Sequence, residues 1–506
     1  MSNRPPRWLV ALIVLISLPL LLPFLYVIER AADVGLARSI ELLWRPRMWE
    51  LLSNTLLLMV FVTLFAIILG TLCAFLLERY RFCGKGFFQV AITLPLCIPA
   101  FVSCFTWISL TFRVEGLWGT IGIMTLSSFP LAYLPVAATL KRLDRSLEEV
   151  SLSLAKSQAY TFWHAIFPQL KPAIGSSVLL IALHMLVEFG AVSILNYQTF
   201  TTAIFQEYEM AFNNNTAALL SGVLMVICIL VVMGEIRFRG TQTLYQSGKG
   251  VIRPYPLKTL SAGKQILAVN FFTTIFMLSI GVPITMLIYW LTVGSSIENA
   301  VDFGEFFTAF TNSLTISTLG ATLTVICALP LVWAAVRYRS KLTIWLDRIP
   351  YLLHAVPGLV IALSLVFFTI NYAYSLYQTF AMVVVAYFML YLPMAQTTLR
   401  SSLEQMSSNI EKVGQSLGRS NFYIFRTLVI PAMLPGIAAA FALVFLNLMK
   451  ELTATLLLTP NDIKTLSTAV WEYTSDAQYA AATPYAIMLV LFSGIPVFLL
   501  KRYGFK

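Results

Sequence analysis

Long runs of apolar residues, separated by short polar stretches, dominate the chain. The runs fall at about 8–28, 54–77, 87–110, 117–140, 173–195, 216–236, 266–292, 312–336, 349–372, 375–399, 434–458 and 483–500. Most have close to the roughly 20 residues that an α-helix needs to cross the hydrocarbon core of a bilayer. The pattern predicts an all-α, polytopic membrane protein with about twelve transmembrane helices.

The composition excludes other classes of protein. Of the 506 residues, 58% are hydrophobic and only 11% are charged, whereas a soluble domain carries about 25% charged residues. A soluble enzyme, a secreted disulfide scaffold and a disordered chain are therefore excluded. The six cysteines lie in or beside apolar runs without a CxxC spacing, so we interpret them as small side chains of the membrane core.

The distribution of basic residues predicts the orientation. With the N-terminus inside, 27 of the 34 lysines and arginines fall in cytoplasmic segments, six fall outside and Lys450 falls within a span. Basic residues are enriched in cytoplasmic loops, so both termini are expected in the cytoplasm. This topology also accounts for the net charge of +11 without a nucleic-acid partner.

The chain contains an internal duplication. Asn54 recurs as Asn312 and Pro99 as Pro357, both 258 residues later, and beyond a five-residue insertion the shift becomes 263. The order of these matches predicts two parallel six-helix halves, related by a pseudo-two-fold axis along the membrane normal. The expected boundaries are 1–236 for the first half, 237–265 for a basic cytoplasmic linker and 266–506 for the second half.

The largest predicted cytoplasmic loop of each half, at 147–172 and 410–435, carries a shared pattern. A helix-forming start is followed by a small residue, an amphipathic aromatic turn and two prolines four residues apart. The small residue permits a tight bend, and the prolines suit a helix start. The residues singled out are Glu148, Ala155, Phe162, Trp163 and Pro168 in the first loop, and Glu411, Gly418, Phe422, Tyr423 and Pro431 in the second. Such a helix can dock into another protein or lie on lipid.

These loops resemble the "EAA" loop of permease subunits in binding-protein-dependent ABC importers, in which the loop inserts into the nucleotide-binding subunit. Glu411, Leu417, Gly418 and Pro431 match that motif, whereas Ala155 replaces the glycine, so a less sharp bend is expected in the first copy. The resemblance implies the type I ABC importer permease fold in both halves, with cores at about 50–236 and 308–500. It also implies two copies of an ABC ATPase, one under each loop.

The chain has no G-x-x-x-x-G-K-[ST] motif, which is the sequence that cradles nucleotide phosphates. ATP is therefore expected on a separate subunit, and this chain is expected to be no enzyme and to bind no cofactor. A membrane-embedded enzyme is a rival interpretation, but the sequence offers no HExxH motif or catalytic dyad. An ion-gradient secondary transporter is another rival, and it would give the paired loops no role.

Two glutamates fall inside predicted spans, where an ionisable residue is a functional hypothesis by default. Glu188 and Glu451 are 263 residues apart in the fifth span of each half, and His184 and Asn447 lie four residues before them, on the same helix face. Paired carboxylates with oxygen and nitrogen donors suit a hard metal ion on a translocation path. The alternative is a glutamate that fastens its span to a neighbour, with Lys450 serving Glu451.

The segments around these glutamates, at 188–193, 199–205, 449–458 and 465–473, look like those of the ferric-iron branch of the permease family. That resemblance implies Fe³⁺ as the transported substrate, a periplasmic iron-binding protein as partner, and a bacterial inner membrane as location. Permeases for thiamine, polyamines or phosphonates share the architecture and stay open as alternatives.

Overall fold

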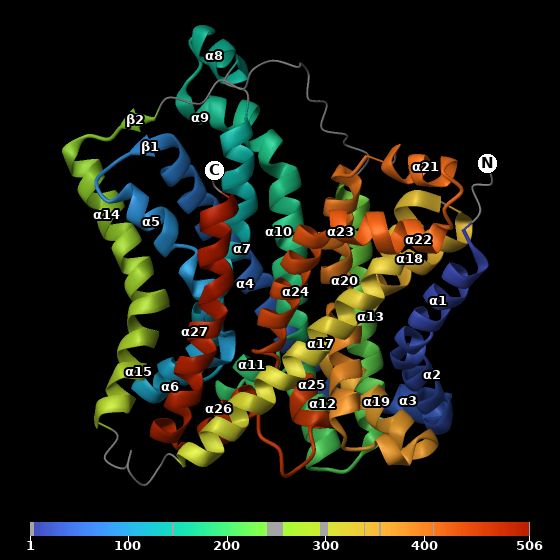
Figure 1. The fold of residues 1–506 in the computed structure, drawn as a ribbon. Helices are drawn as coiled ribbons and strands as arrows, with labels where there is room; N and C mark the ends of the chain where they lie inside the picture. Colours follow the sequence, from blue (N-terminus) through green and yellow to red (C-terminus); the bar gives the residue numbers. More distant parts are fainter. Residues whose placement is uncertain are drawn as a thin grey trace. The chain divides into compact units, whose positions relative to one another are not determined.

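The computed structural model describes residues 5–143, 146–239, 257–293, 302–338, 340–353, 356–407 and 409–504. In these ranges the chain is helical almost throughout (Figure 1). The strands described are β1 (Tyr80–Arg81) and β2 (Lys258–Thr259), which pair in parallel. The prediction of an all-α protein is confirmed.

The first half of the sequence forms a series of α-helices interrupted by short 3₁₀ and π segments. They are α1 (Arg7–Ser17), η1 (Pro19–Leu21), α2 (Leu22–Val34), α3 (Leu36–Leu43), α4 (Pro46–Arg79), α5 (Lys85–Ala91), η2 (Leu94–Cys97), α6 (Ala100–Leu110), η3 (Phe112–Val114), α7 (Leu117–Arg142), α8 (Ser146–Ser153), α9 (Gln158–Thr161), η4 (Phe162–Ile166), α10 (Phe167–Val187), α11 (Gly190–Ile194), α12 (Phe200–Glu209) and α13 (Asn214–Arg239).

The second half repeats this order. Its elements are α14 (Ala262–Phe276), η5 (Met277–Gly281), α15 (Val282–Val293), α17 (Phe303–Tyr338), α18 (Lys341–Leu353), α19 (Gly358–Tyr372), η6 (Tyr374–Leu376), α20 (Phe380–Gln405), α21 (Asn409–Ser416), α22 (Asn421–Ile424), η7 (Phe425–Val429), α23 (Ile430–Ala432), α24 (Leu434–Leu448), α25 (Thr453–Leu458), α26 (Leu466–Ser475) and α27 (Tyr479–Gly504).

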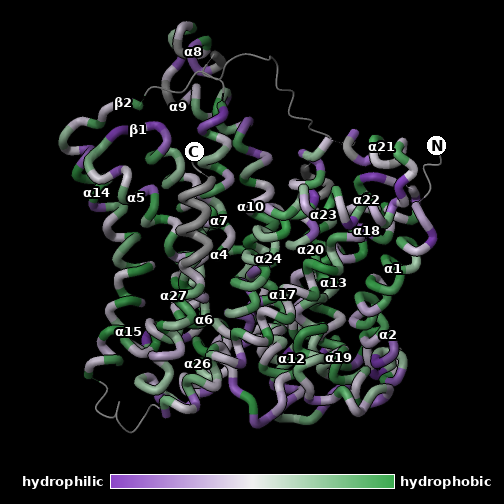
Figure 2. Tube along the Cα trace, viewed as in Figure 1, coloured by the Kyte–Doolittle hydropathy of each residue, from purple (hydrophilic) through white to green (hydrophobic). Residues whose placement is uncertain are grey.

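Each predicted apolar run has a helical counterpart. Among the described residues, eight helices are long and apolar enough to cross a membrane, three further candidates are bent helix pairs, and residues 479–494 form a shorter apolar helix. Figure 2 shows hydrophobic residues along much of the long helices and polar residues gathered at many of their ends. The prediction of a polytopic membrane protein is therefore confirmed, with some of its spans broken.

The helices form two compact units that do not follow the boundary of the sequence repeat. The first-half unit comprises residues 45–203 and 226–295, and the second-half unit comprises 1–44, 204–225 and 296–506. Accordingly α2 packs on α19 in the second-half unit, and α15 packs on α6 in the first-half unit. Each unit thus contains the first span of the other sequence half. Most of the expected linker, residues 240–256, lies outside the described residues.

Within each unit, the long helices next to the predicted cytoplasmic loop pack closely against each other. In the first-half unit α4 packs along α7, and a Cβ added to Gly70 would come within 2.7 Å of the Ala132 Cβ and the Phe129 carbonyl oxygen. In the second-half unit α17 packs along α20, where a Cβ on Gly320 would lie 2.9 Å from the Tyr387 ring. Small residues permit such an approach between membrane helices.

Candidate functional site

The two predicted cytoplasmic loops fold as helical hairpins of the same design. The first hairpin spans residues 146–166 (α8, α9 and η4), and the second spans residues 409–429 (α21, α22 and η7). Figure 1 shows α8 and α9 at one end of α7 and α10, and α21 and α22 at one end of α20.

The bend of each hairpin has the same backbone geometry. Ala155 and Gly418 both adopt a left-handed conformation, with φ of 57° and 70°. The following N–H donates to the carbonyl five residues back in both copies, from Lys156 to Ser151 (3.3 Å) and from Arg419 to Gly414 (3.2 Å). This is the hydrogen bond of a Schellman motif. The expected difference in sharpness is therefore wrong, because the alanine adopts the glycine-type conformation.

A buried ion pair attaches each hairpin to the long helix of its own unit. The Glu148 carboxylate lies 2.9 Å from the Arg79 guanidinium at the end of α4. The Glu411 carboxylate lies 2.6 Å from the Arg337 guanidinium of α17 and also accepts a hydrogen bond from the Trp333 indole (3.3 Å). Both carboxylates are largely buried. The glutamate of the loop motif thus holds the hairpin against its own helix bundle.

An aromatic pair reinforces each attachment. The Phe162 ring packs on Phe75 of α4 at 5.2 Å, and the Phe425 ring packs on Trp333 of α17 at 4.5 Å. Phe75 and Trp333 are equivalent in the repeat, as are Phe162 and Phe425. Phe162, which we predicted on the docking surface, is therefore half-buried against its own unit.

The outward faces of the hairpins carry the same apolar set. Three pairs of equivalent residues are between 42% and 73% exposed: Val150 and Val413, Leu154 and Leu417, and Tyr160 and Tyr423. We call these the docking trios. Leu417 was noted only as a match to the loop motif. The valines, Leu154 and Tyr160 were missed in the sequence, although their equivalence under the 263-residue shift could have revealed them.

A cation lies over the tyrosine of each docking trio. The Lys156 ammonium is 5.2 Å from the Tyr160 ring centroid, and the Arg419 guanidinium carbon is 4.9 Å from that of Tyr423. Trp163 and Phe422 are also exposed, as predicted. Several exposed apolar side chains on one short hairpin, with a cation over the tyrosine, are suited to contact with another protein.

The prolines behave differently in the two copies. Pro168 lies in the first turn of α10 and Pro431 in the first turn of α23. In the first half the helix runs on without a break from Phe162 to Val187, whereas in the second half it bends by 71° between Ala432 and Leu434.

Both predicted fifth spans break at the glutamate. Helix α10 ends at Val187, Glu188 is extended, and its Oε1 accepts the Ala191 N–H at 3.1 Å, at the start of α11. The Glu451 carboxylate accepts the N–H groups of Ala454 and Thr455, both at 3.0 Å, at the start of α25. Each carboxylate therefore caps the short helix that follows it, a role that the sequence analysis did not foresee.

The backbone at each break is held by a hydroxyl from the next helix. Thr201 of α12 donates to the Glu188 carbonyl, and Ser467 of α26 donates to the Glu451 carbonyl, both at 2.7 Å. His184 Nε2 lies 3.8 Å from the Glu188 carboxylate, and Asn447 donates to the Leu443 carbonyl at 2.8 Å. Hence the predicted i, i+4 relation brings His184 near its glutamate, while the Asn447 side chain bonds its own helix.

The described residues contain no group of three or more His, Cys, Asp and Glu side chains that could hold a metal ion. Glu188 belongs to the first-half unit and Glu451 to the second-half unit. What the two environments share is a carboxylate at a helix break, beside hydroxyl groups.

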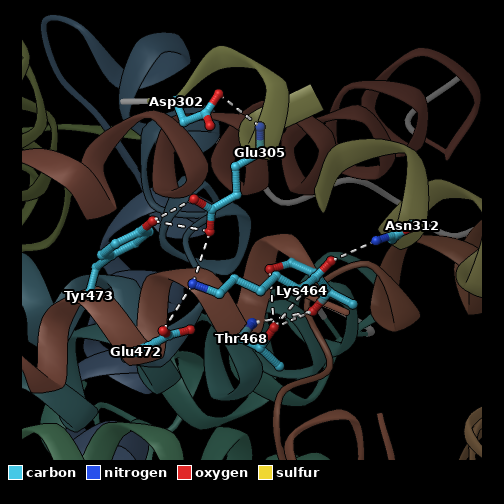
Figure 3. A network of polar contacts seen from close by, with 8 residues as sticks. Asp302, Glu305, Asn312, Lys464, Thr468, Glu472 and Tyr473 are labelled. Carbon is cyan, nitrogen blue, oxygen red and sulfur yellow. Dashed lines mark hydrogen bonds and ion pairs between the residues drawn. The ribbon is translucent and has the colours of Figure 1, made fainter. Parts of the chain in front are cut away.

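A polar network lies at the start of α17 (Figure 3). The Lys464 ammonium is 2.9 Å from both the Glu305 and Glu472 carboxylates, and the Tyr473 hydroxyl donates to Glu305 at 3.2 Å. Partial burial alone would lower the pKa of Lys464, but its hydrogen bonds to Glu305 and Glu472 outweigh this effect and raise that pKa. The lysine stays charged and ties the loop before α26 to α17.

Duplicated bundles of apolar helices, each with an attached hairpin and a broken span, define a membrane transport subunit with two homologous halves. The chain belongs to the family of binding-protein-dependent transport system inner membrane components, which matches residues 66–236 and 326–503. The two matches confirm the predicted duplication and the type I permease fold in both halves. The protein is thus the permease of a transport system, a component of the inner membrane.

Curated relatives extend this assignment. The chain is 80% identical over 506 residues, all of both chains, to the Fe(3+)-transport system permease protein FbpB 2 of Haemophilus influenzae. It is 22% identical over 484 residues, 87% of this chain and 69% of the relative, to the ferric transport system permease protein FbpB of Actinobacillus pleuropneumoniae. The sulfate transport system permease protein CysT of Escherichia coli is 30% identical over 193 residues, 35% of this chain and 69% of the relative.

Proposed function

We propose that this permease carries Fe³⁺ across the bacterial inner membrane after delivery by a periplasmic iron-binding protein. The observation that carries the proposal is the 80% identity, over the whole of both chains, to a permease named for Fe(3+) transport. The relatives named for sulfate and 2-aminoethylphosphonate transport match 45% of this chain or less. They support the importer class more than either substrate.

Two copies of one ABC ATPase drive the cycle, one under each hairpin. The docking trios support this stoichiometry, because equivalent valine, leucine and tyrosine side chains are exposed on both hairpins. A repeated surface suits two identical partners. When ATP closes the ATPase pair, the hairpins move together, and their buried ion pairs pass the movement to α4 and α17.

Both termini and both hairpins face the cytoplasm, and the network around Lys464 faces the periplasm. The excess of basic residues in the segments assigned to the inside supports this orientation. Binding protein then docks on the Lys464 side, and alternating access moves the ion across the membrane.

Glu188 and Glu451, with His184 and Asn447 beside them, line the translocation path. Irregular backbone at membrane depth is tolerated where it is buried in protein or lines a cavity, and both fifth spans break at these glutamates. Carboxylate and hydroxyl oxygens are hard ligands that suit Fe³⁺. The ion would contact carboxylates that already cap the next helix, so binding is transient.

The test is ⁵⁵Fe³⁺ uptake into vesicles that contain this chain, its ATPase and its loaded binding protein. Wild type is compared with the double variant Glu188→Gln and Glu451→Gln, which keeps one oxygen acceptor at each helix start. Parallel vesicles receive labelled sulfate or 2-aminoethylphosphonate. We expect ATP-dependent iron uptake in wild type and at least a roughly tenfold loss in the variant, the change produced by about 1.4 kcal/mol.

Assembly of the complex and its melting temperature are the controls for the variant. Full iron uptake by a correctly assembled double variant would show that the two glutamates do not line the path and serve only to bind the N–H groups of the helices that follow them. Uptake of another substrate, and not of iron, by wild type would overturn the iron assignment while leaving the importer.

A further inference from the structure

The second hairpin has a contact that the first lacks the residues to make. Trp8, in the first turn of α1, stacks on Trp333 of α17 with ring centroids 6.2 Å apart and 29° between the planes. The same Trp8 ring meets Phe422 of α22 edge-on at 5.6 Å. All three residues belong to the second-half unit, so α1 contacts both the hairpin and the helix to which the hairpin is attached.

The Trp8 contact continues to the motif glutamate. Trp333 receives Trp8 on one side, packs on Phe425 at 4.5 Å and donates its indole N–H to the Glu411 carboxylate at 3.3 Å. Glu411 in turn pairs with Arg337. A continuous series of ring and hydrogen-bond contacts therefore runs from α1 to the centre of the second hairpin.

In the first half the equivalent positions differ in kind. Phe75 stands where Trp333 stands and has no N–H to donate, and Ala159 stands at the position of Phe422. Helix α14 is the first helix of the second sequence half. Its aromatic rings pack next to β1 and on α5: Phe272 stacks on Phe82 at 5.4 Å, and Phe276 packs on Phe87 at 5.5 Å. The first span of the second half thus packs around α5 and β1.

We infer that Trp8 is a positioning residue for the second hairpin, and that the two hairpins transmit ATPase closure with unequal stiffness. The inference rests on the proposed coupling role of the hairpins. A pair of packed aromatic rings contributes more to stability than its buried area alone. Loss of both Trp8 contacts therefore makes the second hairpin detach from α17 more often. The first hairpin, which Glu148 and Phe162 attach to α4 of its own unit, is unaffected.

The experiment compares wild type with Trp8→Ala, Trp8→Phe and Trp345→Ala in the complex assembled with ATPase and binding protein. Trp345 is a largely exposed tryptophan of the same unit and serves as the matched control. Hydrogen–deuterium exchange is followed over residues 409–429 and, as an internal reference, over 146–166. The ATP hydrolysed per ion imported is measured on the same preparations.

For Trp8→Ala we expect exchange over 409–429 to rise roughly fivefold, from the loss of two ring contacts, with 146–166 unchanged. More ATP is then hydrolysed per ion, Trp8→Phe restores most of both values, and Trp345→Ala changes neither. Unchanged exchange over 409–429, or an equal rise in both hairpins, would overturn the inference.

If Trp8→Ala does not assemble, Phe422→Ala removes the edge-on contact and keeps the Trp8–Trp333 stack. This variant is measured without the ATPase, because Phe422 is also a predicted docking residue, and it must still raise exchange over 409–429. The exchange measurement needs no cargo. A wild-type complex that imports no iron would therefore contradict the proposed substrate, while the comparison between the two hairpins still decides the role of Trp8.

Discussion

At the residue scale, Ala155 keeps the left-handed backbone conformation of the hairpin bend although alanine adopts it less readily than glycine. Its φ of 57° matches the 70° of Gly418, and an L-residue in this region is strained by roughly 1–2 kcal/mol. The replacement Ala155→Gly removes that strain, although glycine also gains freedom in the unfolded chain. We expect a net stabilisation of about 0.5–1 kcal/mol, seen as a higher melting temperature of the purified complex. Gly418→Ala is the mirror control and should lower it.

A second prediction concerns the buried carboxylate of the second hairpin. Glu411→Gln leaves the Arg337 charge without its carboxylate, although Arg337 keeps hydrogen bonds to the Leu403 and Met406 carbonyls. We expect a loss of about 2 kcal/mol, less than for a fully stranded buried charge. Glu404→Gln, at an exposed position of α20 in the same unit, should be neutral.

A double-variant cycle with Arg337→Gln separates this ion pair from general damage. The loss in the double variant should be smaller than the summed losses of the single variants, because the second change removes the unpaired charge. Strictly additive losses in melting experiments would show that Arg337 and Glu411 act independently.

Several residue roles were accessible from the sequence and others were not. The repeat pointed to Glu148, Glu411, Ala155 and Gly418 because motif positions recur at a fixed shift. The orientation of Phe162 could not be predicted, because helical spacing within a π-helical segment differs from that of an α-helix, so the ring turns towards Phe75.

At the scale of elements, the short helices after the broken spans are defined by their first turns. Helix α26 begins at a capping box formed by Thr465 and Thr468, and the preceding Lys464 pairs with Glu305 of α17 (Figure 3). The sequence predicted one continuous fifth span, because apolar content gives no sign of a break. The break arises because the glutamate side chain competes for the backbone N–H groups of the next turn.

The ion pairs of Lys464 lead to a pH-resolved prediction. Its pKa is raised above the ordinary 10.5 in the folded protein, so its contribution to stability is complete below that value and is lost only as the pH rises through the raised pKa. Lys464→Met should cost roughly 1 kcal/mol, since the pairs are partly exposed, and the cost should be constant from about pH 7 to 9. A cost that falls within this range, or an equal effect of Lys171→Met, would contradict it.

At the scale of the whole molecule, the docking trios predict how the ATPase is held. An aspartate in place of Leu154 or Leu417 puts a charge into an apolar contact, so each single variant should weaken co-purification of the ATPase about tenfold, for a loss near 1.4 kcal/mol. The double variant should abolish it. The control is Lys171→Asp, which adds the same side chain at an exposed position near the start of α10. Undiminished co-purification by the double variant would exclude the trios from the interface.

Orientation can be read from a native cysteine. All six cysteines lie in the described part of the chain, and Cys83, beside β1, is the exposed one. A membrane-impermeant maleimide should therefore label Cys83 in inside-out vesicles and leave it unlabelled in right-side-out vesicles, with Cys83→Ser as the blank. Labelling from the periplasmic side would reverse the proposed orientation of the whole chain.

The composition of the two compact units bears on the synthesis of the protein. Helices α1 and α2 leave the ribosome well before α17 and α19, which belong to the same compact unit and are translated more than 250 residues later. The first-half unit in turn stays incomplete until α14 and α15 have been inserted. Neither unit can therefore fold completely while only the first half of the sequence has been translated. The helices inserted first must stay in the bilayer without their final packing partners until the second half has been synthesised.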